Sequence, residues 1–403
     1  MHQTIYEVKG ETEMASQFPA LRGKMGEMEY ALVMMRLGEV VRHIGYAEDM
    51  QEWDGGIPSE FKKQRKLNMS RITNEMVPYL TATPDHFYAA ITAELERPGD
   101  PLNKLLFQSV EGGDGTMGIL TLDGSEQIMA LDGQHRLKSI ELAMKTHPDL
   151  SRESIAVILV PGKGYRKSQQ LFTDLNRYAK QPSKTLNLLF EHREFFAVIA
   201  KEVGSNARTF RDRVNLETNS LGQKARHHIT LGVLYECVLA LLEGHYNDGE
   251  KAITKIREAT NLVTHIYDDV VTPTLPEFEN MLKGDLLPYD LRTKYIFNHS
   301  VGQQAMARAI RAARDQFSEG WEDIIRKAFA LIDWRIISPQ WEGTAIQGGA
   351  IGSRRQNIEQ TATVLKLLVG VTVPQKELDS LTNALQATEP NRTLPKPVIE
   401  VAA

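Results

Sequence analysis

Apolar and polar positions alternate over two stretches in the first half of the chain, and this period of two is typical of half-buried strands. Residues 18–37 alternate around the short segment from Gly23 to Gly26, which predicts a hairpin. Residues 118–131 alternate around Asp123-Gly124, where glycine accepts the positive φ of a tight turn, and this predicts a second hairpin. Two more strands of the same sheet are expected at residues 86–94 and 155–160.

Helical spacing replaces this alternation in the second half of the chain. From residue 186 onward, apolar residues recur every three or four positions, as they do in the helices of a bundle. The expected helices cover residues 186–203, 229–243, 250–267, 275–282, 293–317, 320–332 and 354–369. We therefore expect a mixed α+β fold, with an α/β domain at 1–185 and a mainly helical domain at 186–375. Because proline and polar residues are frequent at 376–403, a flexible tail is expected there.

The most informative polar segment lies where a predicted strand changes into a predicted helix. It reads Asp132-Gly133-Gln134-His135-Arg136 and is called the DGQHR loop below. A helix N-terminus presents unpaired backbone N–H groups that favour an anion, so the last four residues of this loop are expected to bind a phosphate group. A purely structural role, with Asp132 as a helix cap, is the alternative.

A second polar segment follows the strand predicted at 155–160. Asp174, Asn176, Arg177 and Lys180 lie within two turns of one expected helix. We expect Asn176, Arg177 and Lys180 to complete the phosphate pocket of the DGQHR loop, although a solvated helix with an Asp-Arg pair would show the same spacing. The glycines and lysine at 161–164 lack the full spacing of a phosphate-binding P-loop and are expected to form a turn.

Two basic stretches are candidates for contact with DNA phosphates, because such contact needs lysine and arginine gathered on one surface. The first stretch contains Lys62, Lys63, Arg65 and Arg71, and the second contains Arg208, Arg211, Arg213, Lys224 and Arg226. A charged, solvated face is the alternative, since 25% of the chain is charged.

Composition limits the other possibilities. The chain has 47 basic and 52 acidic side chains, so any contact with nucleic acid must come from local patches. A single cysteine, Cys237, excludes disulfides within the chain, and no metal site is expected. The apolar run at 229–242 is too short and too polar to cross a membrane, and the first residues lack the apolar core of a signal peptide. We expect a cytoplasmic protein with no membrane partner.

Three motifs resemble a known family. They are LDGQHRLKSI at 131–140, FPALRG at 18–23 and FTDLNRYAK at 172–180. Together they resemble the DGQHR-domain proteins, and among these the DndB family associated with DNA phosphorothioate modification. The resemblance implies a core similar to the ParB and sulfiredoxin fold. It also implies a protein that binds double-stranded DNA and regulates the modification genes, with other DNA modification proteins as further partners. For a repressor that reads a palindrome, symmetry alone leads us to expect a homodimer.

Two alternatives to a regulator remain. The first is an enzyme of the same fold, either an ATPase or CTPase or a DNA-nicking enzyme, which would use a nucleoside triphosphate with magnesium as cofactor. Asp132 would then bind the metal ion, His135 would act as general acid or base, and Arg136 would hold the phosphates. The second alternative is a scaffold that gathers the modification enzymes through the helical half. The resemblance favours the regulator, which needs no catalysis.

Overall fold

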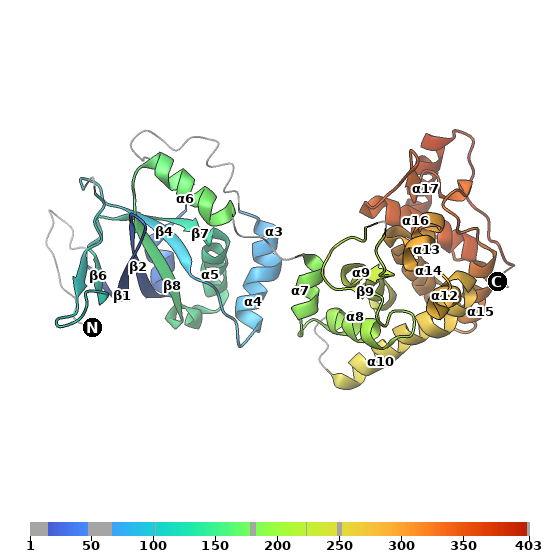
Figure 1. The fold of residues 1–403 in the computed structure, drawn as a ribbon, viewed down its shortest axis with the longest axis horizontal. Coiled ribbons are helices and arrows are strands. Elements are labelled where there is room, and N and C mark those ends of the chain that lie inside the picture. Colours follow the sequence, from blue (N-terminus) through green and yellow to red (C-terminus); the bar gives the residue numbers. More distant parts are fainter. Residues whose placement is uncertain are drawn as a thin grey trace. The chain divides into compact units, whose positions relative to one another are not determined.

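The computed structural model describes residues 15–46, 67–100, 102–177, 183–222, 224–247 and 252–400. Contacts divide the chain into an N-terminal unit, residues 1–180, and a C-terminal unit, residues 181–403, so the division falls five residues before the boundary expected at 185. The N-terminal unit contains the sheet, drawn in blue to green in Figure 1, and the C-terminal unit is mainly helical. The predicted mixed α+β fold is therefore confirmed.

An eight-stranded sheet forms the centre of the described N-terminal unit, in the order β3-β7-β4-β8-β2-β1-β6-β5. The strands are β1 (Ser16–Met25), β2 (Met28–Arg36), β3 (Ile44–Gly45), β4 (Ile91–Glu96), β5 (Phe107–Ser109), β6 (Met117–Leu122), β7 (Gln127–Asp132) and β8 (Ser154–Pro161). The pairs β4–β8 and β3–β7 are parallel and the other neighbours are antiparallel. The first predicted hairpin is confirmed, because β1 and β2 pair from Ala20↔Val33 to Met25↔Met28.

Helices cover both faces of the sheet near β7. The helices of this unit are α1 (Leu37–His43), α3 (Met69–Arg71), η1 (Ile72–Met76), α4 (Val77–Ala82), α5 (Gln134–Thr146), η2 (Pro148–Arg152) and α6 (Tyr165–Arg177). In β7, Ile128 and Ala130 belong to the core that includes Ile140 of α5, whereas Met129 and Leu131 pack with Leu171 of α6. Strand β7 is therefore apolar on both sides.

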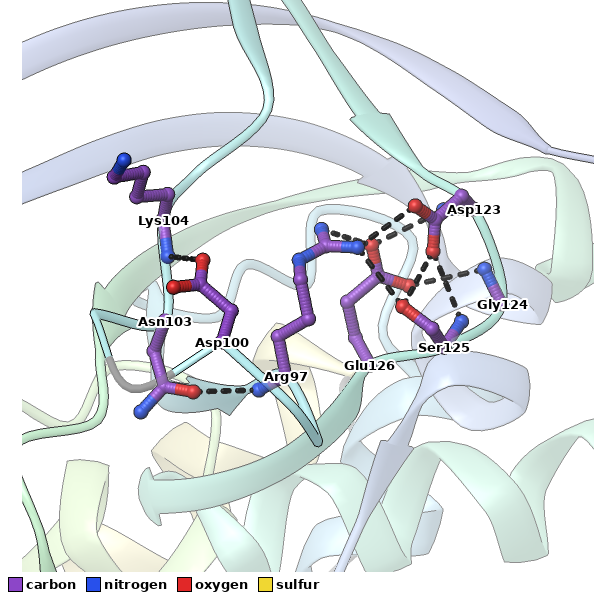
Figure 2. A network of polar contacts seen from close by, with 8 residues as sticks. All are labelled: Arg97, Asp100, Asn103, Lys104, Asp123, Gly124, Ser125 and Glu126. Atoms are coloured by element: carbon purple, nitrogen blue, oxygen red, sulfur yellow. Dashed lines mark hydrogen bonds and ion pairs between the residues drawn. The ribbon is translucent and has the colours of Figure 1, made fainter.

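The second predicted hairpin is wrong, although both of its strands exist. Strand β6 pairs with β1 and β5, whereas β7 pairs with β4 and β3, so the two strands lie apart in the sheet. Figure 2 shows the contacts that the turn between them makes: Asp123, Ser125 and Glu126 surround the guanidinium of Arg97. Arg97 donates to Asp123 at 2.7 Å and to Glu126 at 2.5 Å. Arg97 thus holds the connection between β6 and β7, for which the Asp123-Gly124 turn had predicted a hairpin.

Helices make up most of the C-terminal unit and enclose a single large apolar core. The helices are α7 (Lys184–Phe190), α8 (Phe195–Asn206), α9 (Leu231–Leu242), α10 (Ile253–His265), η3 (Ile266–Val271), α11 (Thr272–Thr274), α12 (Pro276–Lys283), α13 (Pro288–Lys294), η4 (Ile296–Asn298), α14 (Ser300–Phe317), α15 (Trp321–Leu331), η5 (Pro339–Trp341), α16 (Arg355–Val369) and α17 (Gln375–Thr388). The short strand pairs are β9 (Val214–Asn215) with β10 (Ile229–Thr230) and β11 (Ile346–Gln347) with β12 (Ala350–Ile351). Helix α14 packs against α9, α15 and α16, so it lies at the centre of this core.

Two of the expected long helices are broken. The helix expected at 186–203 is split into α7 and α8, and the one expected at 293–317 is split into α13, η4 and α14. The chain packs tightly at the second break: a Cβ atom at position 302 would lie only 2.1 Å from the carbonyl oxygen of Ile296. The close approach of η4 to the first turn of α14 therefore requires glycine at this position.

The first part of the segment expected to be a flexible tail, 376–403, is helical. Residues 375–388 form α17, whose Leu381 and Leu385 are buried. Val398 donates its backbone N–H to the carbonyl of Leu368 at 2.9 Å. The proline and polar content of this segment concealed an amphipathic helix, and Val398 beyond it is hydrogen-bonded to the end of α16. Within the described ranges, every helix is too short or too polar to cross a lipid bilayer.

We expect Arg97→Met to lower the free energy of unfolding of the N-terminal unit by about 3 kcal/mol, because it leaves the buried Glu126 carboxylate without its cation. The side chains of Arg97 and Glu126 are 10% and 2% exposed. Arg22→Met is the matched control, since its pair with Glu29 is half exposed and should cost less than about 1 kcal/mol. Hydrogen exchange of the β4 and β7 amides measures both changes, and equal losses would contradict the expectation.

Candidate functional site

The DGQHR loop joins the sheet to helix α5. Asp132 ends β7, Gly133 has a φ of +93°, and α5 begins at Gln134. A Cβ atom at position 133 would lie 3.1 Å from both Nε of Arg136 and Cγ1 of Ile91. Glycine is therefore needed both for the left-handed backbone and for the close approach of these two side chains.

The polar side chains of the DGQHR loop bind the loop and its neighbours. Arg136 donates from Nη2 to Asp132 at 2.5 Å and from Nη1 to the carbonyl of Ala89 at 3.0 Å. Gln134 is buried and donates to the carbonyl of Ala130 at 3.1 Å. The arginine thus connects the end of β7 with the segment that leads into β4, and its charge is balanced by Asp132.

His135 connects the same loop to the short helix α3. Its Nε2 accepts the backbone N–H of Asn68 at 3.0 Å, so the imidazole hydrogen lies on Nδ1. Burial, and then the nearby charge of Arg71, lower the pKa of His135 below its usual value. The neutral imidazole therefore predominates at pH 7. Arg71 itself, one of the residues predicted to contact DNA, is exposed and lies 3.6 Å from Glu75.

The second polar segment lies on α6. Ser168 of this helix donates to the buried carboxylate of Glu94 on β4 at 2.7 Å, and Gln170 donates to Asp174 at 2.8 Å. Asn176 and Arg177 are in the last turn of α6, but the structure does not describe their side chains. Lys180 lies outside the described residues. Their contribution to a phosphate pocket therefore stays a prediction.

The two basic stretches differ in what the structure describes. Lys62, Lys63 and Arg65 of the first stretch lie outside the described residues. In the second stretch, Arg208 donates to Glu279 at 3.1 Å and to the carbonyl of Asp268 at 2.9 Å. The charge of Arg208 is therefore already balanced by an acidic partner.

The remaining basic residues of the second stretch lie within residues 207–222 and 224–228, which are called the basic loop below. Arg211, Arg213, Lys224 and Arg226 form no ion pair with any acidic group that the structure describes. Parallel pairing of β9 with β10 closes the loop, and the backbone N–H of His228 bonds the carbonyl of Arg213 at 2.7 Å. Arg213 and His228 are thus held side by side.

Arg292 organises the basic loop and was missed in the sequence. Its Nη1 donates to the carbonyl of His227 at 2.7 Å, and its Nη2 donates to the carbonyls of Ala225 and Gly222. Only 8% of Arg292 is exposed. Arg292 precedes the expected helix at 293–317 and belongs to no motif, so only the folded arrangement reveals its contacts.

His228 lies in the core beneath this loop. Its ring stacks on Phe210 at 5.8 Å and meets Phe278 edge-on at 5.1 Å. Complete burial lowers the pKa of His228 to about 3, so the side chain is neutral throughout the physiological range. His228 therefore contributes packing and neutral polar atoms, not charge.

Comparison with known families gives a match over most of the chain. A family model named DndB and described as DNA-sulfur modification-associated matches residues 18–372. The matched range includes the sheet, the DGQHR loop and most of the helical unit. Neither the comparison with curated proteins nor that with solved structures finds a match.

We expect Gly133→Ala to destabilise the N-terminal unit by about 2–3 kcal/mol, because alanine would have to adopt a left-handed backbone and displace Arg136. Gly99→Ala is the matched control, since Gly99 has a φ of +88° but nothing within 4 Å of its Cβ position. The control should cost about 1 kcal/mol. Urea denaturation followed by circular dichroism measures the difference, and equal costs would mean that the close contacts at Gly133 have no energetic weight.

We expect His228 to make the C-terminal unit sensitive to acid. The pKa of its folded form is about 3 against 6.5 in the unfolded chain, so only the unfolded chain gains a proton between these values. The contribution of His228 to the free energy of unfolding is therefore fully present above pH 6.5. It is lost as the pH decreases toward 3, and the loss is about 2 kcal/mol at pH 5. His228→Phe should remove this part of the pH dependence.

Phe210→Leu is the control for this prediction, because it weakens the same packing but keeps the imidazole. Tryptophan fluorescence can follow unfolding of this unit, since Trp334 and Trp341 are buried there. The difference in unfolding free energy between pH 7 and pH 5 is compared among the three proteins. An unchanged difference in His228→Phe would contradict the expectation.

Proposed function

The chain belongs to the DndB family of proteins associated with DNA sulfur modification, and on this premise we propose that it binds double-stranded DNA and regulates the genes of a phosphorothioate modification system. The observation that carries the proposal is the basic loop, where four cations lie without acidic partners among the described residues. Such cations can neutralise DNA phosphates with no loss of an internal ion pair.

The construction of the basic loop supports this proposal. A surface that binds a regular backbone needs its cations in fixed positions, and Arg292 fixes the loop through three carbonyl groups. Arg213 also donates to the carbonyl of Arg211 at 2.9 Å, and Arg211 donates to that of Asn206 at 3.1 Å. The charges therefore project from a segment whose backbone is held by hydrogen bonds.

The DGQHR loop favours the regulator over the alternative enzyme. In a nucleotide-hydrolysing enzyme, Arg136 would hold phosphates and Asp132 would bind a magnesium ion. Here these two side chains bond each other at 2.5 Å, and the Nε2 lone pair of His135 is occupied by the backbone N–H of Asn68. Catalysis would require all three groups to leave their partners. We propose that the loop joins strand to helix, and that ATP or CTP hydrolysis by the purified protein should be absent.

Salt dependence of DNA binding tests the proposal. Each phosphate contact changes the slope of log K against log salt by about 0.9, so Arg211→Gln and Arg226→Gln should each make the slope about 0.9 less steep. Arg208→Gln is the matched control, because its charge is balanced by Glu279. It should alter stability and leave the slope unchanged. Fluorescence anisotropy with duplex DNA at about 50 to 300 mM salt measures all four proteins.

Two results would overturn the proposal. One is equal slopes for the wild type and both loop variants, which would place the DNA contact elsewhere or nowhere. The other is turnover of ATP or CTP that Arg136→Ala removes, which would make the DGQHR loop catalytic. A scaffold role is distinguished by a third result, in which the protein captures modification proteins but shows no affinity for duplex DNA. Light scattering of the complex reports whether a homodimer binds.

A further inference from the structure

A cavity of about 150 Å³ lies between the basic loop and the first turn of α14. Its lining includes Ser220, Arg292 and Ser300, together with the buried side chains of His228 and Asn298. None of the described residues in this lining is an aspartate or a glutamate. Ser220 is exposed, so the cavity reaches the surface of the loop. The space is polar, electropositive and open to a small solute.

The charge of Arg292 is the first reason to expect an anion here. Its two Nη groups donate to backbone carbonyls, and its Nε–H is buried without an acceptor among the described residues. Burial lowers the pKa of Arg292, and no carboxylate in the described part of the chain counteracts this effect. A buried cation without a counter-charge is costly, and an anion beside it would remove that cost.

The end of α14 is the second reason. This helix has 18 residues, and its N-cap residue, His299, makes no side-chain capping bond. The imidazole of His299 instead bonds the carbonyl of Arg292 at 2.6 Å. The first backbone N–H groups of α14 carry the partial positive charge of the helix dipole, and Ser300 at this end of the helix lines the cavity.

We propose that this cavity binds a phosphate-sized oxyanion, held by Arg292 and by the first backbone N–H groups of α14. We call it the anion cavity. It is separate from the phosphate pocket expected at the DGQHR loop, and it does not depend on DNA binding. Two sources share the required chemistry, namely free inorganic phosphate and a phosphate group of a nucleic-acid backbone. An anion bound there would connect α14 to the loop that carries the unpaired cations.

Two substitutions at Ser220 test the anion cavity without disturbing the core. Ser220→Asp places a negative charge at the mouth, and Ser220→Asn adds a neutral side chain of the same size. Ser220 is exposed, and it accepts a hydrogen bond from Thr218 at 2.8 Å through its backbone carbonyl, not through its side chain. Both variants should therefore fold. The probe is inorganic phosphate, titrated against chloride at constant ionic strength, with the thermal midpoint of tryptophan fluorescence as readout.

Saturating phosphate should raise the midpoint of the wild type and of Ser220→Asn by roughly 2–4 °C, and should have no effect on Ser220→Asp. Arg292→Met should also lose the response. Arg314→Met is its control, because Arg314 donates to the carbonyl of Leu241 near the other end of α14. That variant should keep the phosphate response at a lower midpoint. An equal response in Ser220→Asp and Ser220→Asn would show a general salt effect and overturn the proposal.

Crystals soaked in tungstate give a test that needs no variant. An anomalous peak within hydrogen-bonding distance of Arg292 supports the anion cavity, and peaks confined to other places overturn it. Competition then identifies the source. If phosphate displaces duplex DNA and Ser220→Asp weakens DNA binding, the natural anion is a backbone phosphate. If phosphate binds without affecting DNA, it is free phosphate. If DNA fails to bind at all, the phosphate titration still decides the anion cavity.

Discussion

A guanidinium that is largely removed from solvent has five N–H donors and a permanent charge, and the need to supply acceptors for it constrains both units of this protein. Arg97, Arg136 and Arg292 each bind a segment distant from them in sequence. Arg97 holds the connection between β6 and β7, Arg136 holds the approach to β4, and Arg292 holds the basic loop. In all three places, the position of a loop depends on an arginine that is distant from that loop in sequence.

The three arginines differ in how their charge is balanced, and this difference separates the two candidate sites. Arg97 faces Asp123 and Glu126, and Arg136 faces Asp132. Arg292 bonds only neutral carbonyls among the described residues. The charge of the DGQHR loop is therefore balanced within the loop, whereas the basic loop and the cavity beside it keep an excess of positive charge. This is the physical reason why we assign the contact with anions to the helical unit.

The family match agrees with a function that uses both units. Residues 18–372 begin within the first strand of the sheet and extend beyond α16, so the family is not defined by the DGQHR loop alone. In the DGQHR loop, Gly133 and Arg136 hold the junction of β7 and α5, which is consistent with a structural role. A basic loop held by a buried arginine suits contact with a ligand whose charges are regularly spaced. The two segments thus have complementary roles in the proposed regulator.

Local patterns in the sequence determined the mixed fold class, the first hairpin, the strand-to-helix change at Gly133 and most helices of the C-terminal unit. These features follow from interactions between residues close in sequence, which periodicity and turn chemistry record. Strand order was decided only by the tertiary structure. Asp123-Gly124 is a typical hairpin turn, but here Asp123 binds Arg97 and the turn connects two strands that are not neighbours in the sheet. The sequence likewise identified the basic residues at 208–226 as candidates for an anion surface, but it could not show that Arg208 is neutralised by Glu279 and that Arg292 is not neutralised. Charge balance depends on groups about 60 to 70 residues apart, and only folding brings such groups together.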